Sequence, residues 1–185
     1  MSGICGWVGE ADRPVLDAML AAIDYRGDSI DTAHAPGVAL GYRWWKARPG
    51  KSPGIHREGS QLVACAGTFA PSADSPAAAF VSKLTSDHKN LDGAFAAAWW
   101  DGDRRRLTLA RDPFGVRSLY YTTHRGVFYF ASEIKQLLGQ AEMTSALNAQ
   151  GLDAATGTPQ SFDQFIRAEI DKWRKVVQAA NIKVE

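Results

Sequence analysis

The pattern that most constrains the fold of this sequence is a pair of consecutive hairpins between residues 94 and 131. Residues 94–100 form a continuous apolar run, and a turn with Gly102 at its centre separates them from a second apolar run at 107–110. Residues 119–123 and 126–131 then flank a short polar turn in the same way. This succession of hairpins predicts antiparallel sheets rather than a helical bundle.

The rest of the chain alternates between strand and helix patterns. Apolar or glycine-rich runs predict strands, and apolar residues at helical spacing predict helices. The predicted strands lie at residues 2–9, 38–45 and 62–66, and the predicted helices at 13–24, 76–87, 132–138 and 161–180. Ser75 and Ser161 are the expected caps of two of these helices. Helices covering antiparallel sheets make this an α+β chain.

Composition narrows the function classes. The formal net charge is +1, so no overall field attracts nucleic acid or an anionic membrane. The run at residues 104–106 is basic but lies beside Asp101 and Asp103, as expected of a solvated hairpin tip. The 2 cysteines form no disulfide framework, and no spacing suits a metal or a cofactor. With no long apolar stretch and no signal-peptide pattern, we expect no membrane contact and a cytoplasmic location.

Three stretches carry a family resemblance. They are Met1-Ser2-Gly3-Ile4-Cys5-Gly6, Arg26-Gly27-Asp28, and the segment 91–135 with its Arg111-Asp112-Pro113-Phe114-Gly115 and Ala131-Ser132-Glu133 motifs. Together they resemble the class II glutamine amidotransferase half of asparagine synthetases. The resemblance implies that residues 1–140 form an N-terminal-nucleophile hydrolase-like αββα sandwich of two antiparallel sheets.

The resemblance implies that removal of Met1 exposes the catalytic nucleophile, and this position is Ser2. A hydroxyl is a much weaker nucleophile than a partly ionised thiol, so we expect an impaired site. Cys5 does not replace it, because alternation along a strand puts Ser2, Ile4 and Val8 on one face and Cys5 on the other. A rival register, in which processing makes Cys5 the first residue, stays open.

The remaining site residues also depart from the family pattern. Gly67 matches the oxyanion-hole glycine, but its neighbours are Ala66 and Thr68 where the family has Asn and Glu. Losing one oxyanion donor costs about 10²–10³ in rate. Arg43 matches the arginine that binds the glutamine carboxylate; the alternative is a surface arginine at a strand edge. Asp74 is the candidate for the substrate amine, although it follows Gly67 too closely for the family spacing.

Arg111, Asp112 and Glu133 are interpreted as structural residues that hold a hairpin turn through a buried Arg–carboxylate arrangement. The phosphate loop of the synthetase half is absent from the sequence. Any ammonia released from L-glutamine would therefore pass to a separate synthetase subunit.

The C-terminal part differs from the rest. Residues 141–160 are small and polar and predict a linker, and residues 161–185 predict an amphipathic helix. Residues 156–185 resemble the last helix of tripartite tricarboxylate transporter receptors, which implies a borrowed helix rather than a tricarboxylate site. Its apolar stripe needs a surface to cover, either on this domain or on a second subunit, as in a homodimer.

The sequence is consistent with three candidate functions. The favoured one is a degenerate amidotransferase-like domain that serves as a scaffold or binding partner of a synthetase-type enzyme. The alternative is an active glutamine hydrolase that uses Ser2 or, after processing, Cys5. A solute-binding protein is the weakest, because only the tail supports it.

Overall fold

The computed structural model describes residues 2–11, 13–46, 54–69, 75–87, 91–138 and 159–179. The strands are β1 (Gly3–Val8), β2 (Ser29–Ala35), β3 (Val38–Trp44), β4 (Ile55–Glu58), β5 (Gln61–Phe69), β6 (Gly93–Asp101), β7 (Arg106–Arg111), β8 (Tyr120–His124) and β9 (Val127–Ala131). The helices are α1 (Arg13–Ala21), the short 3₁₀ helix η1 (Asp24–Arg26), α2 (Pro76–Asp87), α3 (Ile134–Leu138) and α5 (Pro159–Ala179).

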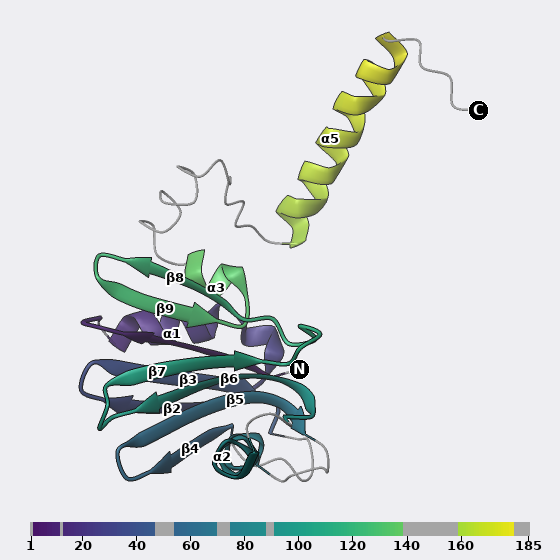
Figure 1. Cartoon of the computed structure of the whole chain (residues 1–185). Helices are drawn as coiled ribbons and strands as arrows, with labels where there is room; N and C mark the ends of the chain where they lie inside the picture. Colours follow the sequence, from purple (N-terminus) through teal and green to yellow (C-terminus); the bar gives the residue numbers. More distant parts are fainter. Residues whose placement is uncertain are drawn as a thin grey trace.

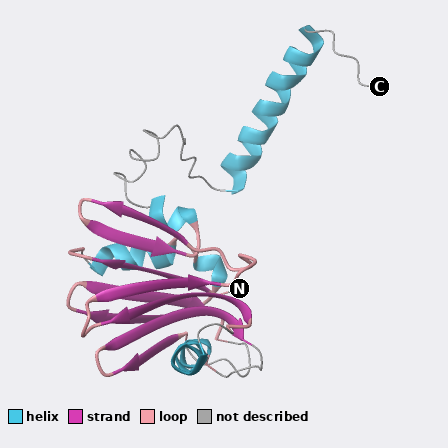
Figure 2. Ribbon diagram, viewed as in Figure 1, coloured by secondary structure: helices cyan, strands magenta, loops and turns pink. Residues whose placement is uncertain are grey.

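The strands form two antiparallel sheets (Figure 1; Figure 2). One has the order β2-β3-β1-β9-β8 and is called here the β1 sheet; the other has the order β4-β5-β6-β7 and is called the β5 sheet. Both predicted hairpins are present, as β6–β7 and β8–β9. They belong to different sheets, so the segment between them crosses from one layer to the other.

Strand alternation sorts the apolar residues into three layers of packing. Between the sheets, Ile4, Tyr42 and Phe130 of the β1 sheet pack with alanines and Trp100 of the β5 sheet. We call these facing surfaces the inner faces. The outer face of the β1 sheet packs against α1 and α3, and the outer face of the β5 sheet packs against α2. The predicted αββα sandwich is therefore confirmed.

Two strands were not expected from the sequence. β2 occupies a segment to which the sequence analysis assigned no strand. β4 follows a turn-rich loop and has little apolar content of its own. Both lie at sheet edges. The first predicted helix is also shorter than expected, because α1 ends at Ala21 and η1 follows. The predicted cap of α2 is confirmed, since Ala78 N donates to Ser75 Oγ over 3.2 Å.

The C-terminal amphipathic helix is present as α5, and its apolar stripe is exposed. Exposed large apolar residues of α5 are Phe162, Phe165, Ile166, Ile170, Trp173, Val176 and Val177. Ion pairs one turn apart, such as Arg167–Asp163 at 2.7 Å, support the helix from its polar side. Most of the predicted linker, residues 141–158, lies outside the described residues.

Candidate functional site at the start of β1

β1 is a central strand, and its first residues are held from both sides. Gly3 lies opposite Arg43 of β3. On the other side, Ile4 N donates to Ser132 Oγ and Ser132 N donates to Ile4 O, both over 2.8 Å. Ser132 thus extends the β1–β9 pairing beyond Ala131 with its own side chain, which fixes the backbone next to Ser2.

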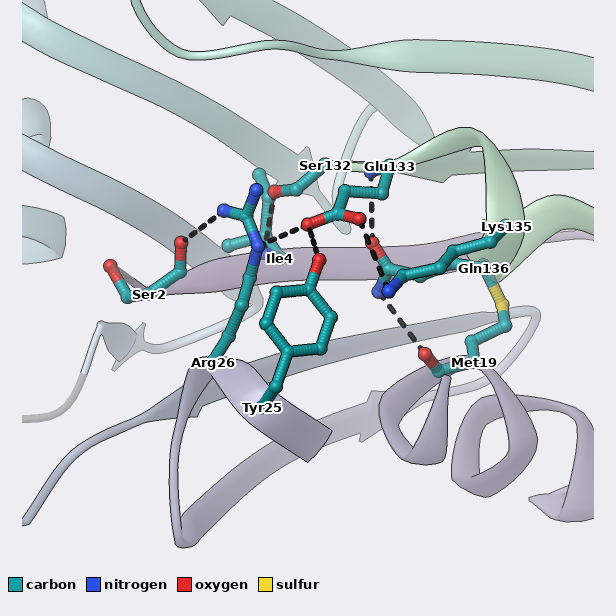
Figure 3. A network of polar contacts seen from close by, with 9 residues as sticks. All are labelled: Ser2, Ile4, Met19, Tyr25, Arg26, Ser132, Glu133, Lys135 and Gln136. Atoms are coloured by element: carbon teal, nitrogen blue, oxygen red, sulfur yellow. Dashed lines mark hydrogen bonds and ion pairs between the residues drawn. The ribbon is translucent and has the colours of Figure 1, made fainter. Parts of the chain in front are cut away.

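A network of charged side chains connects Ser2 to the β9–α3 junction (Figure 3). Arg26 Nη1 donates to the carbonyl oxygen of Ser2 over 3.0 Å. Arg26 Nε and the Tyr25 hydroxyl both donate to Glu133 Oε1. Lys135 Nζ lies 3.5 Å from Glu133 Oε2 and 3.8 Å from the centre of the Tyr25 ring.

The charge of Glu133 is stabilised by this network. Burial raises the pKa of the Glu133 carboxyl, but the Tyr25 hydrogen bond and the Arg26 charge outweigh burial and lower the pKa below its usual value. An ionised Glu133 keeps Arg26 oriented towards Ser2. Sequence reasoning assigned Glu133 a structural role with Arg111, but its partner is Arg26. Both residues lie in motifs that the sequence analysis identified, Arg26-Gly27 and Ser132-Glu133. The sequence alone did not show that the two motifs are in contact.

Ser2 and Arg43 project to opposite sides of the β1 sheet. Ser2 is in phase with Ile4, which lies on the inner face opposite Tyr42. Burial raises the pKa of the Tyr42 hydroxyl, and a hydrogen bond with Ser2 opposes that effect. Arg43 is on the helix-covered face, where it donates to Gly27 O over 2.7 Å and to Leu20 O over 3.1 Å.

The structure therefore does not bring together all of the expected site residues. Arg43 is not a surface arginine at a strand edge either, because β3 pairs with strands on both sides. Its side chain joins the end of α1 to the loop after η1. Asp74, the other candidate for substrate binding, lies outside the described residues.

Both thiols are buried in the outer layers. Cys5 packs with Trp7 on the helix-covered face of the β1 sheet, and Cys65 packs beneath α2. This arrangement confirms the predicted alternation of Cys5 with Ile4 and Val8. Burial raises the pKa of the Cys5 thiol, although a Gln136 hydrogen bond opposes it, and burial also raises the pKa of Cys65. Neither thiol is placed or ionised for attack on the inner face.

Gly67 occupies a position in β5 that requires glycine. Its φ is +152°, and a Cβ added there would lie 2.2 Å from the carbonyl oxygen of Ala94. Phe95 lies opposite Gly67 on β6. The N–H and C=O groups of Phe95 both form hydrogen bonds with Asp112, not with Gly67. Gly67 and Phe95 are therefore a non-hydrogen-bonded pair, and the Gly67 N–H points away from β6.

The direction of the Gly67 N–H decides whether it can act as the expected oxyanion donor. The N–H of Cys65 points in the same direction as that of Gly67 and donates to Gly54 O over 2.7 Å. Among the described residues, the pairing of β4 with β5 extends to Ile55 and Ala64. The Gly67 N–H therefore points to the side of β5 on which β4 lies, beyond the last described pair. Ala66 beside it is buried between the sheets and supplies no polar group, while Thr68 is exposed.

The loop between β7 and β8 is organised around Asp112. Its carboxylate accepts from Val116 N over 2.9 Å, from Arg117 N over 3.0 Å and from Phe95 N over 3.3 Å. The expectation that an arginine side chain pairs with Asp112 is therefore wrong. Arg111 is exposed, and backbone N–H groups satisfy Asp112.

The requirements of a metal site and of a membrane span can also be compared with the described residues. In the described part of the chain, no group of three or more His, Cys, Asp or Glu side chains is arranged to hold a metal ion. No helix among the described residues is long and apolar enough to cross a membrane.

Comparison with known proteins identifies similar sequences and a similar fold. A family model described as a glutamine amidotransferase domain matches residues 57–139. Asparagine synthetase [glutamine-hydrolyzing] 3 of Bacillus subtilis is 39% identical over 71 residues, which are 38% of this chain and 11% of that protein. Asparagine synthetase [glutamine-hydrolyzing] 2 of the same organism is 27% identical over 155 residues, covering 72% of this chain and 21% of that protein.

A further similar protein is the amidase chry2 of Gibberella zeae, 47% identical over 49 residues, or 26% of this chain and 7% of that protein. The chain spans about a fifth or less of the length of these curated relatives. Among solved structures, the glutamine phosphoribosylpyrophosphate amidotransferase of B. subtilis matches with a TM-score of 0.57 and 15% identity, covering 80% of this chain and 43% of that chain. That likeness supports the N-terminal-nucleophile hydrolase-like fold, and the sequence matches show that the chain is similar to asparagine synthetases and, over residues 57–139, to a glutamine amidotransferase domain.

Proposed function

We propose that this chain is an amidotransferase-like domain in which glutamine hydrolysis is impaired or lost, and that it acts as a scaffold or binding partner of a synthetase-type enzyme. One observation carries the proposal: the inner face at the start of β1 presents a serine, whereas both thiols of the chain are buried in the outer layers. A serine hydroxyl is a much weaker nucleophile than a partly ionised thiol. Ala66 and the orientation of Arg43 away from Ser2 give further support.

The alternative is an active hydrolase that uses Ser2, with L-glutamine as substrate. Two observations favour it. Arg26 holds the Ser2 carbonyl, and the Gly67 N–H points away from β6 beyond the end of β4. A backbone N–H of this kind is the type of donor that stabilises the oxyanion in acyl transfer.

A paired measurement separates the two functions. Mass spectrometry of the purified protein identifies the first residue, and a glutamate-release assay measures glutamine hydrolysis. We expect no turnover above the level of the Ser2→Ala variant. Turnover that Ser2→Ala abolishes would establish the hydrolase, and a mature chain that begins at Cys5 would support the rival register.

The scaffold role is tested by association. The chain is mixed with a synthetase-type enzyme from its own source, and complex formation is followed by sedimentation together with glutamine- and ammonia-dependent product formation. We expect a complex in which ammonia-dependent synthesis continues without new glutamine-dependent synthesis. If the two proteins sediment independently at micromolar concentrations, the partner role is wrong.

A further inference from the structure

The apolar stripe of α5 is uncovered along the whole helix. Its seven large side chains are between 38% and 63% exposed, from Phe162 near the first turn to Val177 near the last. Together they present on the order of 600–800 Å² per helix, because an aromatic side chain alone can bury about 150–250 Å². Two such stripes that face each other would bury about 1,200–1,600 Å², within the roughly 1,200–2,000 Å² that stable protein interfaces bury.

The centre of the stripe has the spacing of a helix–helix contact. Residues 162, 166, 169, 173 and 176 follow one another at alternating intervals of four and three, as the a and d positions of a heptad repeat do. All of these positions except Glu169 are apolar. Side chains with this spacing fit into the holes between the side chains of a second helix. We therefore expect the partner of α5 to be a helix.

The described helices of the sandwich already use their apolar faces. α1 and α3 pack on the β1 sheet through Leu16, Leu20 and Leu137, and α2 packs on the β5 sheet through Phe80. Among the helices that the structure describes, α5 is thus the one that keeps a heptad seam exposed along its length (Figure 1). The matching partner is the same helix in a second copy of the chain.

Glu169, the charged residue of the seam, selects the orientation of such a pair. Within its own helix, its carboxylate accepts from Lys172 Nζ over 3.0 Å and from Trp173 Nε1 over 3.2 Å. In a parallel pair the two Glu169 carboxylates would lie at the same height and repel each other. In an antiparallel pair, where a and d positions share layers, each Glu169 lies beside the partner's Trp173 instead.

We propose that α5 is a homodimerisation helix, which pairs antiparallel with α5 of a second copy of this chain. The twofold axis crosses the seam midway between Glu169 and Trp173, so both copies use the same surface. Ile166 of each copy then packs beside the partner's Val176. The pairing does not involve Ser2, so it stands or falls independently of the proposed function.

Sedimentation equilibrium of the full chain over a hundredfold range of concentration, up to about 100 μM, tests the pairing. We expect the mass to rise from one chain to two. Ile166→Asp places a charge in the seam and should raise the dimer Kd at least about tenfold. Ala168→Asp places the same charge on the exposed polar side of α5 and should leave the Kd within about twofold. Ile166→Ala, which keeps a good helix former, should also weaken the dimer if Ile166→Asp unwinds α5.

Disulfide trapping tests the orientation. Chains with Ile166→Cys and chains with Val176→Cys are oxidised separately and as a mixture; the native cysteines are buried. We expect a cross-linked dimer from the mixture alone, because two copies of position 166 lie about 15 Å apart along an antiparallel pair.

Three outcomes overturn the proposal. A native chain that stays monomeric at about 100 μM refutes the dimer, and so do Ile166→Asp and Ile166→Ala chains that both dimerise as the native chain does. Cross-linking of either cysteine variant with itself, without cross-linking in the mixture, refutes the antiparallel orientation.

Discussion

At the residue scale, position within a strand decides which side chains can meet. Arg43 and Tyr42 are neighbours in sequence, yet Tyr42 contacts the Ser2 side and Arg43 the helix side. Motif matching located Arg43, but a motif does not show which face of the strand the side chain occupies. Alternation did predict the separation of Cys5 from Ile4, because that argument used only the strand period. The sequence could not predict the pairing of Arg26 with Glu133, because the two residues are 107 positions apart.

Thiol labelling tests the placement of Cys5. Because Cys5 is fully buried and burial raises its pKa, iodoacetamide at neutral pH should modify it at least about tenfold more slowly in the native protein than in urea. Peptide mass spectrometry measures the modified fraction with time, and Cys65 provides an internal control with the same burial. Rapid native labelling of Cys5 alone would favour the rival register.

Gly67→Ala tests the backbone geometry of β5. The added Cβ would meet the Ala94 carbonyl at 2.2 Å in a backbone conformation that side chains rarely adopt. We expect a loss of about 3 kcal/mol in the free energy of unfolding, measured by urea denaturation. Gly59→Ala is the matched control: its φ is +56° with nothing near the new Cβ, so about 1–2 kcal/mol is expected. Equal losses would contradict the close approach at Gly67.

At the element scale, the sequence predicted central strands better than edge strands. β5 and β6 are apolar because both of their faces are covered, so a run of apolar letters identifies them. β4 reads Ile-His-Arg-Glu and β2 reads Ser-Ile-Asp-Thr-Ala-His-Ala, compositions that also suit loops. Their strand conformation depends on the partner strand, which a single sequence does not reveal.

The β7–β8 loop offers an element-scale test through Asp112. Asp112→Asn keeps the shape but replaces one acceptor oxygen with a donor, leaving a buried backbone N–H group unsatisfied. We expect a loss of about 1–3 kcal/mol in the free energy of unfolding in urea. Asp103→Asn at the exposed β6–β7 turn should change it little. If the two variants were equally stable, Asp112 would not organise this loop.

At the scale of the whole molecule, two carboxylates couple stability to pH. Burial raises the pKa of Asp112, but hydrogen bonds from the Arg117 and Val116 N–H groups outweigh it and lower the pKa, as the Tyr25 and Arg26 contacts do for Glu133. A carboxyl with a depressed native pKa stabilises the fold above its unfolded pKa, about 3.9–4.3. This stabilisation is lost as pH falls through the native pKa.

Melting temperatures between pH 7 and pH 2 test this coupling. The native protein should lose stability steeply below about pH 4. The double variant Asp112→Asn, Glu133→Gln should be less stable at pH 7 but should show a shallower acid dependence. Parallel curves for the two proteins would show that other groups control acid unfolding.

The central position of β1 also has a consequence for the order of assembly. Ile4 and Ser132, which hold each other by two hydrogen bonds, are 128 positions apart in the chain. β1 can therefore pair with β9 only after nearly the whole sandwich has left the ribosome. Long-range pairing of this kind slows folding and leaves an unpaired strand exposed in the meantime. Until β9 pairs with it, β1 exposes an unpaired edge with the apolar side chains of Ile4, Cys5, Trp7 and Val8, the kind of segment that promotes aggregation during folding.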